Sequence, residues 1–267
     1  MFLRSIAPRR DDAVDTDSFP FNVPIIQTLG QVPFDAPVTF LVGENGSGKS
    51  TLLEAIACAM DSVTVGAENV ATDATLADVR RFATTLRLTW TTRVHRGFFL
   101  RAEDFFGYAK RIARIRAEAR ANIERVDREY AGRSPLAKAL AKAPHARTVG
   151  ELRASYGDGM DAQSHGEGFL KLFQSRLVPK GLYLLDEPEA TLSPLRQLAF
   201  LSLLKASVAE QSQFIIATHS PIILAFPGAR ILSCDQVPLA PLAYQDLEHY
   251  TLTKAFLNEP ERYLSQL

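Results

Sequence analysis

The sequence predicts an α/β fold with a mostly parallel sheet covered by helices, an antiparallel β addition and an inserted helical lobe. Three observations predict it. Short apolar runs alternate with helical patterns in the first sixty residues and again from about residue 164. One stretch near residue 88 alternates apolar and polar side chains, and a long middle segment rich in Ala, Arg and Glu has helical spacing.

Four short runs are predicted as strands buried on both faces, because each is mostly apolar and bounded by turn or polar residues. They are residues 38–42, 182–185, 214–217 and 230–233. Leu86, Leu88 and Trp90 instead alternate with polar residues, which is typical of a half-exposed antiparallel strand.

The middle of the chain is predicted to be helical. Ile112, Ala119 and Val126 belong to a series of apolar residues at helical spacing within residues 104–130, and Ser134-Pro135 is a typical helix start, here for a second helix over 136–142. Residues 101–153 contain 13 Lys and Arg against 7 Asp and Glu, a net charge of +6, which leaves −6 for the rest. We therefore expect one domain over 1–267 with residues 104–163 as its inserted lobe.

Composition excludes several classes of protein. The 267 residues carry 30 basic and 30 acidic side chains and are 46% hydrophobic, which excludes a disordered chain and a uniformly basic nucleic-acid coat. Two cysteines, Cys58 and Cys234, are too few for a disulfide scaffold. The apolar runs fall short of the ~20 residues of a membrane helix. We expect a cytoplasmic protein without direct membrane insertion.

A phosphate-binding loop follows the first predicted buried strand. Its pattern G-x-x-x-x-G-K-[ST] precedes a helical stretch, as the motif requires. Backbone N–H groups of such a loop converge on phosphate oxygens, Lys49 is expected to reach the β- and γ-phosphates, and the Ser50 hydroxyl to ligate Mg²⁺. The nucleotide-binding residues predicted here are Gly43, Glu44, Asn45, Gly46, Ser47, Gly48, Lys49, Ser50 and Thr51.

Two carboxylates end the predicted strand at 182–185. Ligands of α/β sheets bind at the carboxyl ends of strands, so Asp186 and Glu187 are placed where a nucleotide site would be. Asp186 suits the coordination shell of Mg²⁺, and Glu187 is suited to orient and polarise an attacking water.

These motifs resemble those of ABC-type ATPases with a P-loop NTPase core. Residues 43–51 resemble Walker A, 164–168 (SHGEG) the signature, 182–187 Walker B, 189–194 (EATLSP) the D-loop, and 217–220 (ATHS) the switch-histidine segment. All five occur in the family's order. The GFFLRAEDFF and SHGEGF strings are similar to small stand-alone ATPases of the RecF/SMC branch.

The resemblance implies a mechanism. Ser164 and Gly166 would face the γ-phosphate of ATP held by a second protomer, so that two chains form a head-to-tail, ATP-dependent homodimer. His219 would contact the γ-phosphate, and Glu187, His219 and Lys49 would be the catalytic residues of an Mg²⁺-dependent ATPase.

The sequence departs from this family in its signature and in its Q-loop. The signature reads Q-S-H-G-E, with His165 and Glu167 at altered positions, and Glu167 must point away from phosphate or bind an arginine of the facing chain. No glutamine lies between Thr51 and Gln163, so Glu103 is the nearest candidate to replace the family's Q-loop glutamine, although it equally fits a plain carboxylate at a helix start. Phe19 and Phe21 are available to stack on adenine, although both also suit a core or strand position.

Several readings of function follow. The first is a soluble ATP-driven switch in DNA maintenance or defence, and the alternative is the nucleotide-binding subunit of an ABC transporter. Residues 104–147 could contact DNA or a protein partner, or form only a solvated helix pair. His95, His145 and His249 lack metal-ligand spacing, and the acidic residues in 11–17 fit a solvated loop.

Overall fold

The computed structural model describes residues 1–9, 17–65, 69–156 and 165–265, and its centre is a six-stranded sheet. The strand order is β5-β6-β7-β3-β8-β9, with the first five strands parallel and β9 antiparallel to β8. The bounds are β5 Gly97–Arg101, β6 Leu182–Asp186, β7 Gln213–Ala217, β3 Val38–Val42, β8 Arg230–Ser233 and β9 Ala240–Pro241. The predicted α/β class, with a mostly parallel sheet, is confirmed.

The four predicted buried runs are β3, β6, β7 and β8, and every residue of β3 and β7 is buried. The sequence analysis did not predict β5, because only its three central residues are apolar and it begins with Gly97 and ends with Arg101. Gly97 has a φ of +124°, and a Cβ there would lie 1.8 Å from the carbonyl oxygen of Leu182. Glycine is therefore needed where β5 approaches β6.

Alternate residues of the sheet enter two separate cores. On one face lie α2 (Lys49–Met60), α3 (Ala77–Thr84) and the short α1 (Pro24–Gln27). On the other lie the start of α4 (Ala102–Glu129), α6 (His165–Arg176), α7 (Pro194–Ala209) and α8 (Pro221–Leu224). Coverage on both faces explains why these strands read as continuous apolar runs.

A second, three-stranded antiparallel sheet has the order β2-β1-β4, with bounds β1 Leu3–Pro8, β2 Val32–Pro33 and β4 Leu86–Trp90. This is the predicted β addition. The fully buried Gln213 side chain joins the two sheets: its Oε1 accepts the N–H groups of Phe2 and Leu3 at 2.7 and 3.0 Å, and its Nε2 donates to the Leu3 carbonyl at 2.9 Å.

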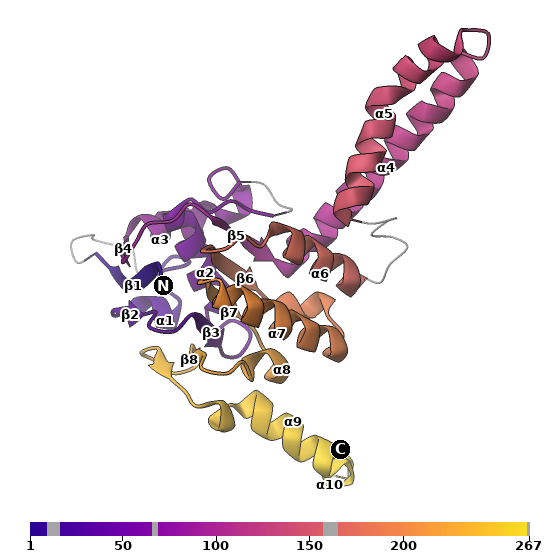
Figure 1. The fold of residues 1–267 in the computed structure, drawn as a ribbon. Helices are drawn as coiled ribbons and strands as arrows, with labels where there is room; N and C mark the ends of the chain where they lie inside the picture. Colours follow the sequence, from indigo (N-terminus) through magenta and orange to yellow (C-terminus); the bar gives the residue numbers. More distant parts are fainter. Residues whose placement is uncertain (10–16, 66–68, 157–164, 266–267) are drawn as a thin grey trace.

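A helical hairpin of α4 and α5 (Pro135–Tyr156) projects from the core (Figure 1). Helical structure was predicted for this segment, but the second helix was predicted to end at residue 142 and instead runs through Pro144. A proline removes one backbone donor, and packing along α4 compensates for this loss. The boundary 104–163 of the inserted lobe stays a prediction, and residues 157–163 lie outside those described.

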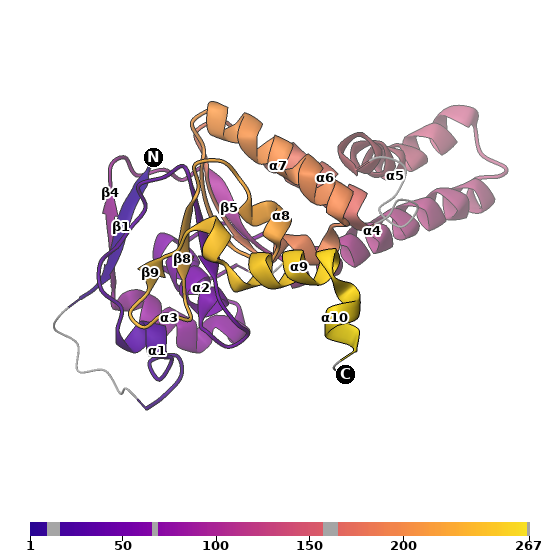
Figure 2. The same ribbon diagram turned by 90° about the horizontal axis from the view of Figure 1, so that it is seen from below.

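The chain ends in α9 (Glu248–Asn258) and α10 (Pro260–Leu264), after the short η3 (Tyr244–Asp246). Helix α9 lies beside α8 in both ribbon views (Figures 1 and 2). Within the described residues, no helix is both long enough and apolar enough to span a bilayer.

Candidate functional site

The predicted phosphate loop connects β3 to α2, in the strand–loop–helix arrangement that the motif requires. Gly48 precedes α2 with a φ of +94°, and a Cβ there would lie 2.7 Å from Val23 Cγ1. A Cβ on Gly43 would lie 2.7 Å from Ser47 Oγ and 2.8 Å from Asp235 Oδ1. The loop therefore needs glycine at both positions, and it leaves the N-terminus of a twelve-residue helix open to an anion.

Lys49 is held inside this loop. Its side chain donates to the carbonyl oxygens of Gly43 and Glu44, both at 2.8 Å, and the residue is only 4% exposed. Because the ammonium group is held by backbone atoms of the loop itself, its charge lies where the motif places the β- and γ-phosphates.

A hydroxyl and a carboxylate meet beside the loop. Ser50 Oγ donates to Asp186 Oδ1 at 3.0 Å, which brings together the two residues predicted as Mg²⁺ ligands. Mg²⁺ prefers oxygen ligands and is usually held by one or two protein groups with water and phosphate oxygens. Ser50 and Asp186 fit this ion, which would neutralise phosphate charge.

Burial raises the pKa of Asp186 to about 7, and the Glu54 and Glu187 charges act in the same direction, while the Ser50 hydrogen bond and Lys49 oppose them. A carboxylate in this state is costly to leave without a cation, because its charged form is poorly solvated. A divalent cation would favour the ionised form.

Glu187 and His219 lie close together, as predicted for two residues that act on one water. His219 Nε2 is 3.8 Å from Glu187 Oε1. Glu187 adopts a left-handed conformation (φ 48°, ψ 48°), and its N–H bonds the Ala217 carbonyl at 2.9 Å. β6 ends at Asp186, directly before this left-handed residue, and the Glu187 side chain is 45% exposed.

The position of His219 is fixed by Glu189. The Glu189 carboxylate accepts the backbone N–H of His219 at 2.6 Å, and burial raises its pKa above the usual value. His219 Nδ1 lies 3.1 Å from His249 Nε2, a residue of α9. Burial, together with the charges of Lys49 and His249, lowers the pKa of His219, which favours the neutral imidazole.

The signature segment is described only in part. Ser164 lies outside the described residues. Gly166 is buried in the first turn of α6, where a Cβ would be 2.7 Å from the Thr191 carbonyl oxygen. Glu167 pairs with Lys171 at 3.1 Å and Arg196 at 3.8 Å within its own chain. Glu167 therefore has two cationic partners within its own chain, and the predicted alternatives, that it points away from phosphate or binds an arginine of a facing chain, stay predictions.

The structure separates the two aromatic candidates for adenine by their burial and leaves the role of Glu103 a prediction. Phe21 belongs to the core and meets Phe82 edge-to-face at 5.8 Å, whereas Phe19 is 47% exposed. Of the two, only Phe19 is free to stack on adenine. Glu103 is 75% exposed on α4 and pairs with Arg101 at 3.5 Å. Its role as a Q-loop substitute stays a prediction.

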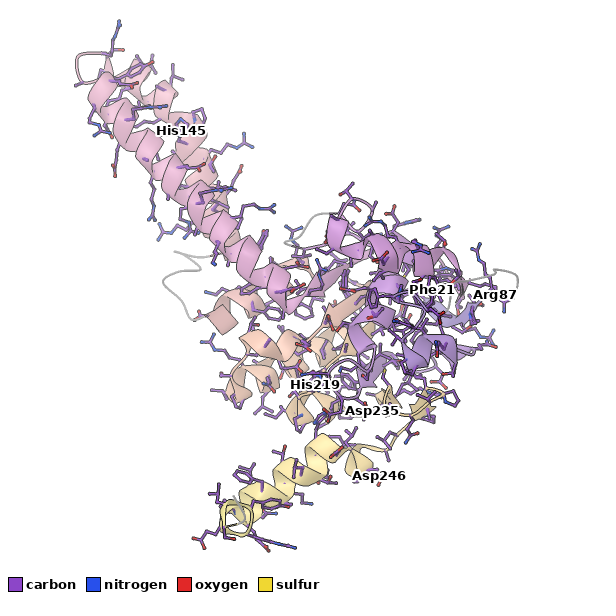
Figure 3. The ribbon with its side chains drawn as sticks, turned by 180° about the vertical axis from the view of Figure 1, so that it is seen from behind. Phe21, Arg87, His145, His219, Asp235 and Asp246 are labelled. Atoms are coloured by element: carbon purple, nitrogen blue, oxygen red, sulfur yellow. The ribbon has the colours of Figure 1, made fainter. Side chains whose placement is uncertain are left out.

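Three site residues were missed by the sequence analysis. Asp235, just past β8, accepts the N–H of Glu44 at 2.7 Å and so anchors the phosphate loop. His249 contacts His219, and Arg101 stands opposite Asp186 in the β5–β6 register. Figure 3 shows His219 and Asp235 in the α/β core and His145 out on the hairpin. Asp235 could have been predicted as a site residue, because it follows the predicted strand at 230–233. No sequence pattern around His249 indicates that it contacts the site.

Two protein families match this chain over residues that include the candidate site. Residues 88–225 match the family described as "AAA domain, putative AbiEii toxin, Type IV TA system", which is more than half of the chain. The chain belongs to this AAA domain family. Residues 23–132 match a second family described as "AAA domain". The chain thus carries a P-loop ATPase domain of the AAA type, in line with the P-loop NTPase core that the motifs predicted. No curated protein sequence matches it.

The chain is also similar, at low sequence identity, to solved structures of an Smc head domain and of a component of an ABC transporter complex. One is the Smc head domain with an extended coiled coil bound to the C-terminal domain of ScpA, from Pyrococcus furiosus (12% identity, 97% of this chain and 99% of that chain, TM-score 0.45). Another is cbiO1 from Clostridium perfringens, part of the ABC transporter complex cbiONQ (15% identity, 99% and 100% coverage, TM-score 0.49).

Proposed function

We propose that this AAA domain binds and hydrolyses ATP with Mg²⁺. The observation that carries the proposal is that residues from three separate segments meet at the carboxyl edge of the sheet: Lys49 and Ser50, Asp186 and Glu187, and His219. Phosphoryl transfer to water needs positioning and charge neutralisation more than covalent chemistry. This set supplies both.

Each residue has a distinct role in the proposal. Lys49 and the loop N–H groups bind the phosphates, and Ser50 and Asp186 hold Mg²⁺. Glu187, half exposed and next to His219, orients the attacking water and accepts its proton. His219 binds the γ-phosphate and keeps that water against Glu187. Mg²⁺, when bound, offsets the charge on the phosphate oxygens.

ATP binding is proposed to bring two chains together head to tail. Ser164 and Gly166 would then contact the γ-phosphate held by the partner, because the N-terminus of a helix suits a multiply charged anion. Nucleotide would shift a monomer–dimer population, and hydrolysis would reverse it.

The switch is proposed to act in the cytoplasm, in DNA maintenance or defence, through a DNA or protein partner at residues 104–147. The net positive charge of that segment and its projection as a hairpin support this (Figure 1). The matched family's description, which names a toxin, supports the defence branch. A contact with DNA would weaken steeply as salt rises.

One set of assays on the full chain tests this function. The wild type should hydrolyse ATP only with Mg²⁺, and Lys49→Ala should lower kcat/KM at least ~100-fold, whereas Lys205→Ala on the surface of α7 should not.

The proposed dimer is tested with Glu187→Gln, which should bind ATP, hydrolyse it slowly and double its mass in light scattering. A Glu187→Gln protein that stays monomeric with ATP and Mg²⁺ rules out the dimer mechanism, and no binding of duplex DNA at low salt rules out DNA as the partner.

A further inference from the structure

The imidazoles of His219 and His249 share one hydrogen bond. Their Nδ1 and Nε2 atoms are 3.1 Å apart, and the rings meet edge-to-face with centroids 5.1 Å apart. His249 is the second residue of α9, whereas His219 follows the carboxyl end of β7, an interior strand of the parallel sheet. A contact between residues 30 positions apart in sequence thus ties the C-terminal helix to the candidate site.

The other ring nitrogen of His219 faces the site. Its Nε2 is buried, has no hydrogen-bond partner within the described residues, and lies 3.8 Å from Glu187 Oε1. A buried polar atom without a partner is costly, which marks this nitrogen as the one that a ligand would satisfy.

Proton counting decides which nitrogen carries hydrogen. A neutral imidazole has one N–H and one acceptor nitrogen, so one of the two rings must donate across the 3.1 Å contact and the other must accept. If His219 donated from Nδ1, its Nε2 lone pair would face the Glu187 carboxylate and any phosphate oxygen. If it accepts at Nδ1, Nε2 carries the N–H and offers a donor to both.

We propose that His249 is a positioning residue that donates from Nε2 to His219 Nδ1 and so holds His219 as the Nε2–H tautomer, with its donor directed at the γ-phosphate. This inference rests on the proposed ATPase function. Second-sphere partners of a histidine commonly fix its tautomer and ring orientation in this manner. The lowered pKa of His219 is consistent with this role, because it favours the neutral ring and only a neutral ring has a tautomer to select.

Nitrogen-15 NMR of the histidine-labelled full chain without nucleotide tests the tautomer directly. The His219 signals are assigned by their loss in His219→Gln. We expect the Nε2–H form in the wild type and a mixed or shifted tautomer in His249→Phe. A wild-type His219 with its proton on Nδ1 overturns the proposal. This readout needs no ATP, so it stands apart from the outcome for ATP hydrolysis.

Steady-state ATPase assays test the functional consequence. His249→Phe, which keeps the ring but not the donor, should lower kcat roughly 10- to 100-fold with little change in KM. His249→Gln places an amide N–H near the same position and should restore most of kcat. His95→Phe, at an exposed site, is the control and should match the wild type.

A double variant separates a positioning role from a general structural one. If His249 acts through His219, His219→Ala with His249→Phe should be no slower than His219→Ala alone. Additive losses, or a His249→Phe enzyme as fast as the wild type, overturn the proposal. If the wild type itself does not hydrolyse ATP, the proposed function fails, while the NMR result still decides the tautomer.

Discussion

Three carboxylates of the candidate site differ in their surroundings, and this difference separates their chemistry. Burial raises the pKa of Asp186 and of Glu189, whereas the Glu187 side chain is 45% exposed beside His219. A buried carboxylate needs a cation or hydrogen-bond donors, and the half-exposed one can reach a water. The three acidic residues within four positions of the chain are therefore suited to three tasks: binding a cation, positioning a backbone, and orienting a water.

Glu189→Gln should change the pH dependence of stability. The folded-state pKa of Glu189 lies above its ordinary value of 4.5, so the stability it contributes is present below that pH and is lost as pH rises through the folded value. The amide keeps an acceptor for the His219 N–H but does not ionise. We expect the variant to gain stability relative to the wild type as pH rises, by about 1.4 kcal/mol per unit of pKa difference.

Urea unfolding of the nucleotide-free chain from about pH 4 to pH 8 measures this difference. Glu261→Gln, at an exposed position of α10, controls for the loss of a surface charge. Equal pH profiles for Glu189→Gln and the wild type would contradict the prediction.

At the scale of elements, the junction of β5 and α4 is held by a buried charge cluster. Arg101 Nη2 is 2.9 Å from Asp73 Oδ2, its Nε is 2.9 Å from Asp104 Oδ2, and its Nη1 is 3.3 Å from Glu54 Oε1. Because Arg101 pairs in register with Asp186 and directly precedes α4, the cluster links the hairpin to the sheet edge that carries the site.

Arg101→Met should destabilise the fold by about 3–5 kcal/mol, because it leaves three largely buried carboxylates without their cation. Thermal or urea unfolding measures the loss. Arg81→Met is the matched control: its ion pair with Asp78 is 3.8 Å long with both side chains more than half exposed, so the change should stay below about 1 kcal/mol. A loss for Arg101→Met no larger than that of the control would contradict the cluster's role.

At the scale of the whole molecule, two sheets are joined through one amide. The antiparallel sheet and the parallel sheet share an apolar core, and Gln213 supplies the polar connection between them by pairing with the backbone of Phe2 and Leu3. Three hydrogen bonds from one side chain fix how the N-terminal strand sits on β7.

Gln213→Met should destabilise the protein by roughly 2–4 kcal/mol, because it removes three hydrogen bonds to the backbone of Phe2 and Leu3, two of them buried, and leaves those backbone groups unpaired. Urea unfolding measures the change, and hydrogen exchange should show lost protection of the Phe2 and Leu3 amides. Gln174→Met, at an exposed position of α6, is the control. An unchanged unfolding midpoint for Gln213→Met would contradict this account.

The sequence by itself determined the parts of the protein that are local in the chain. The apolar runs that became β3, β6, β7 and β8 are contiguous, and so is the phosphate loop from Gly43 to Thr51. Strand patterns and a glycine-rich turn need only neighbouring residues, so their signals survive without a structure. The order of the motifs along the chain then predicted that Asp186, Glu187 and His219 belong to one site.

Only the tertiary structure decided the long-range contacts. These contacts depend on which strand ends and helices meet in space. They are the hydrogen bond from the Glu44 N–H to Asp235, the contact between His219 and His249, and the ion pair of Glu167 with Arg196. The continuation of α5 through Pro144 depends on its packing along α4. A hydrogen bond or ion pair requires its two atoms to lie within about 4 Å, and for residues far apart in the chain that distance is fixed by the packing of the fold and leaves no trace in the local pattern.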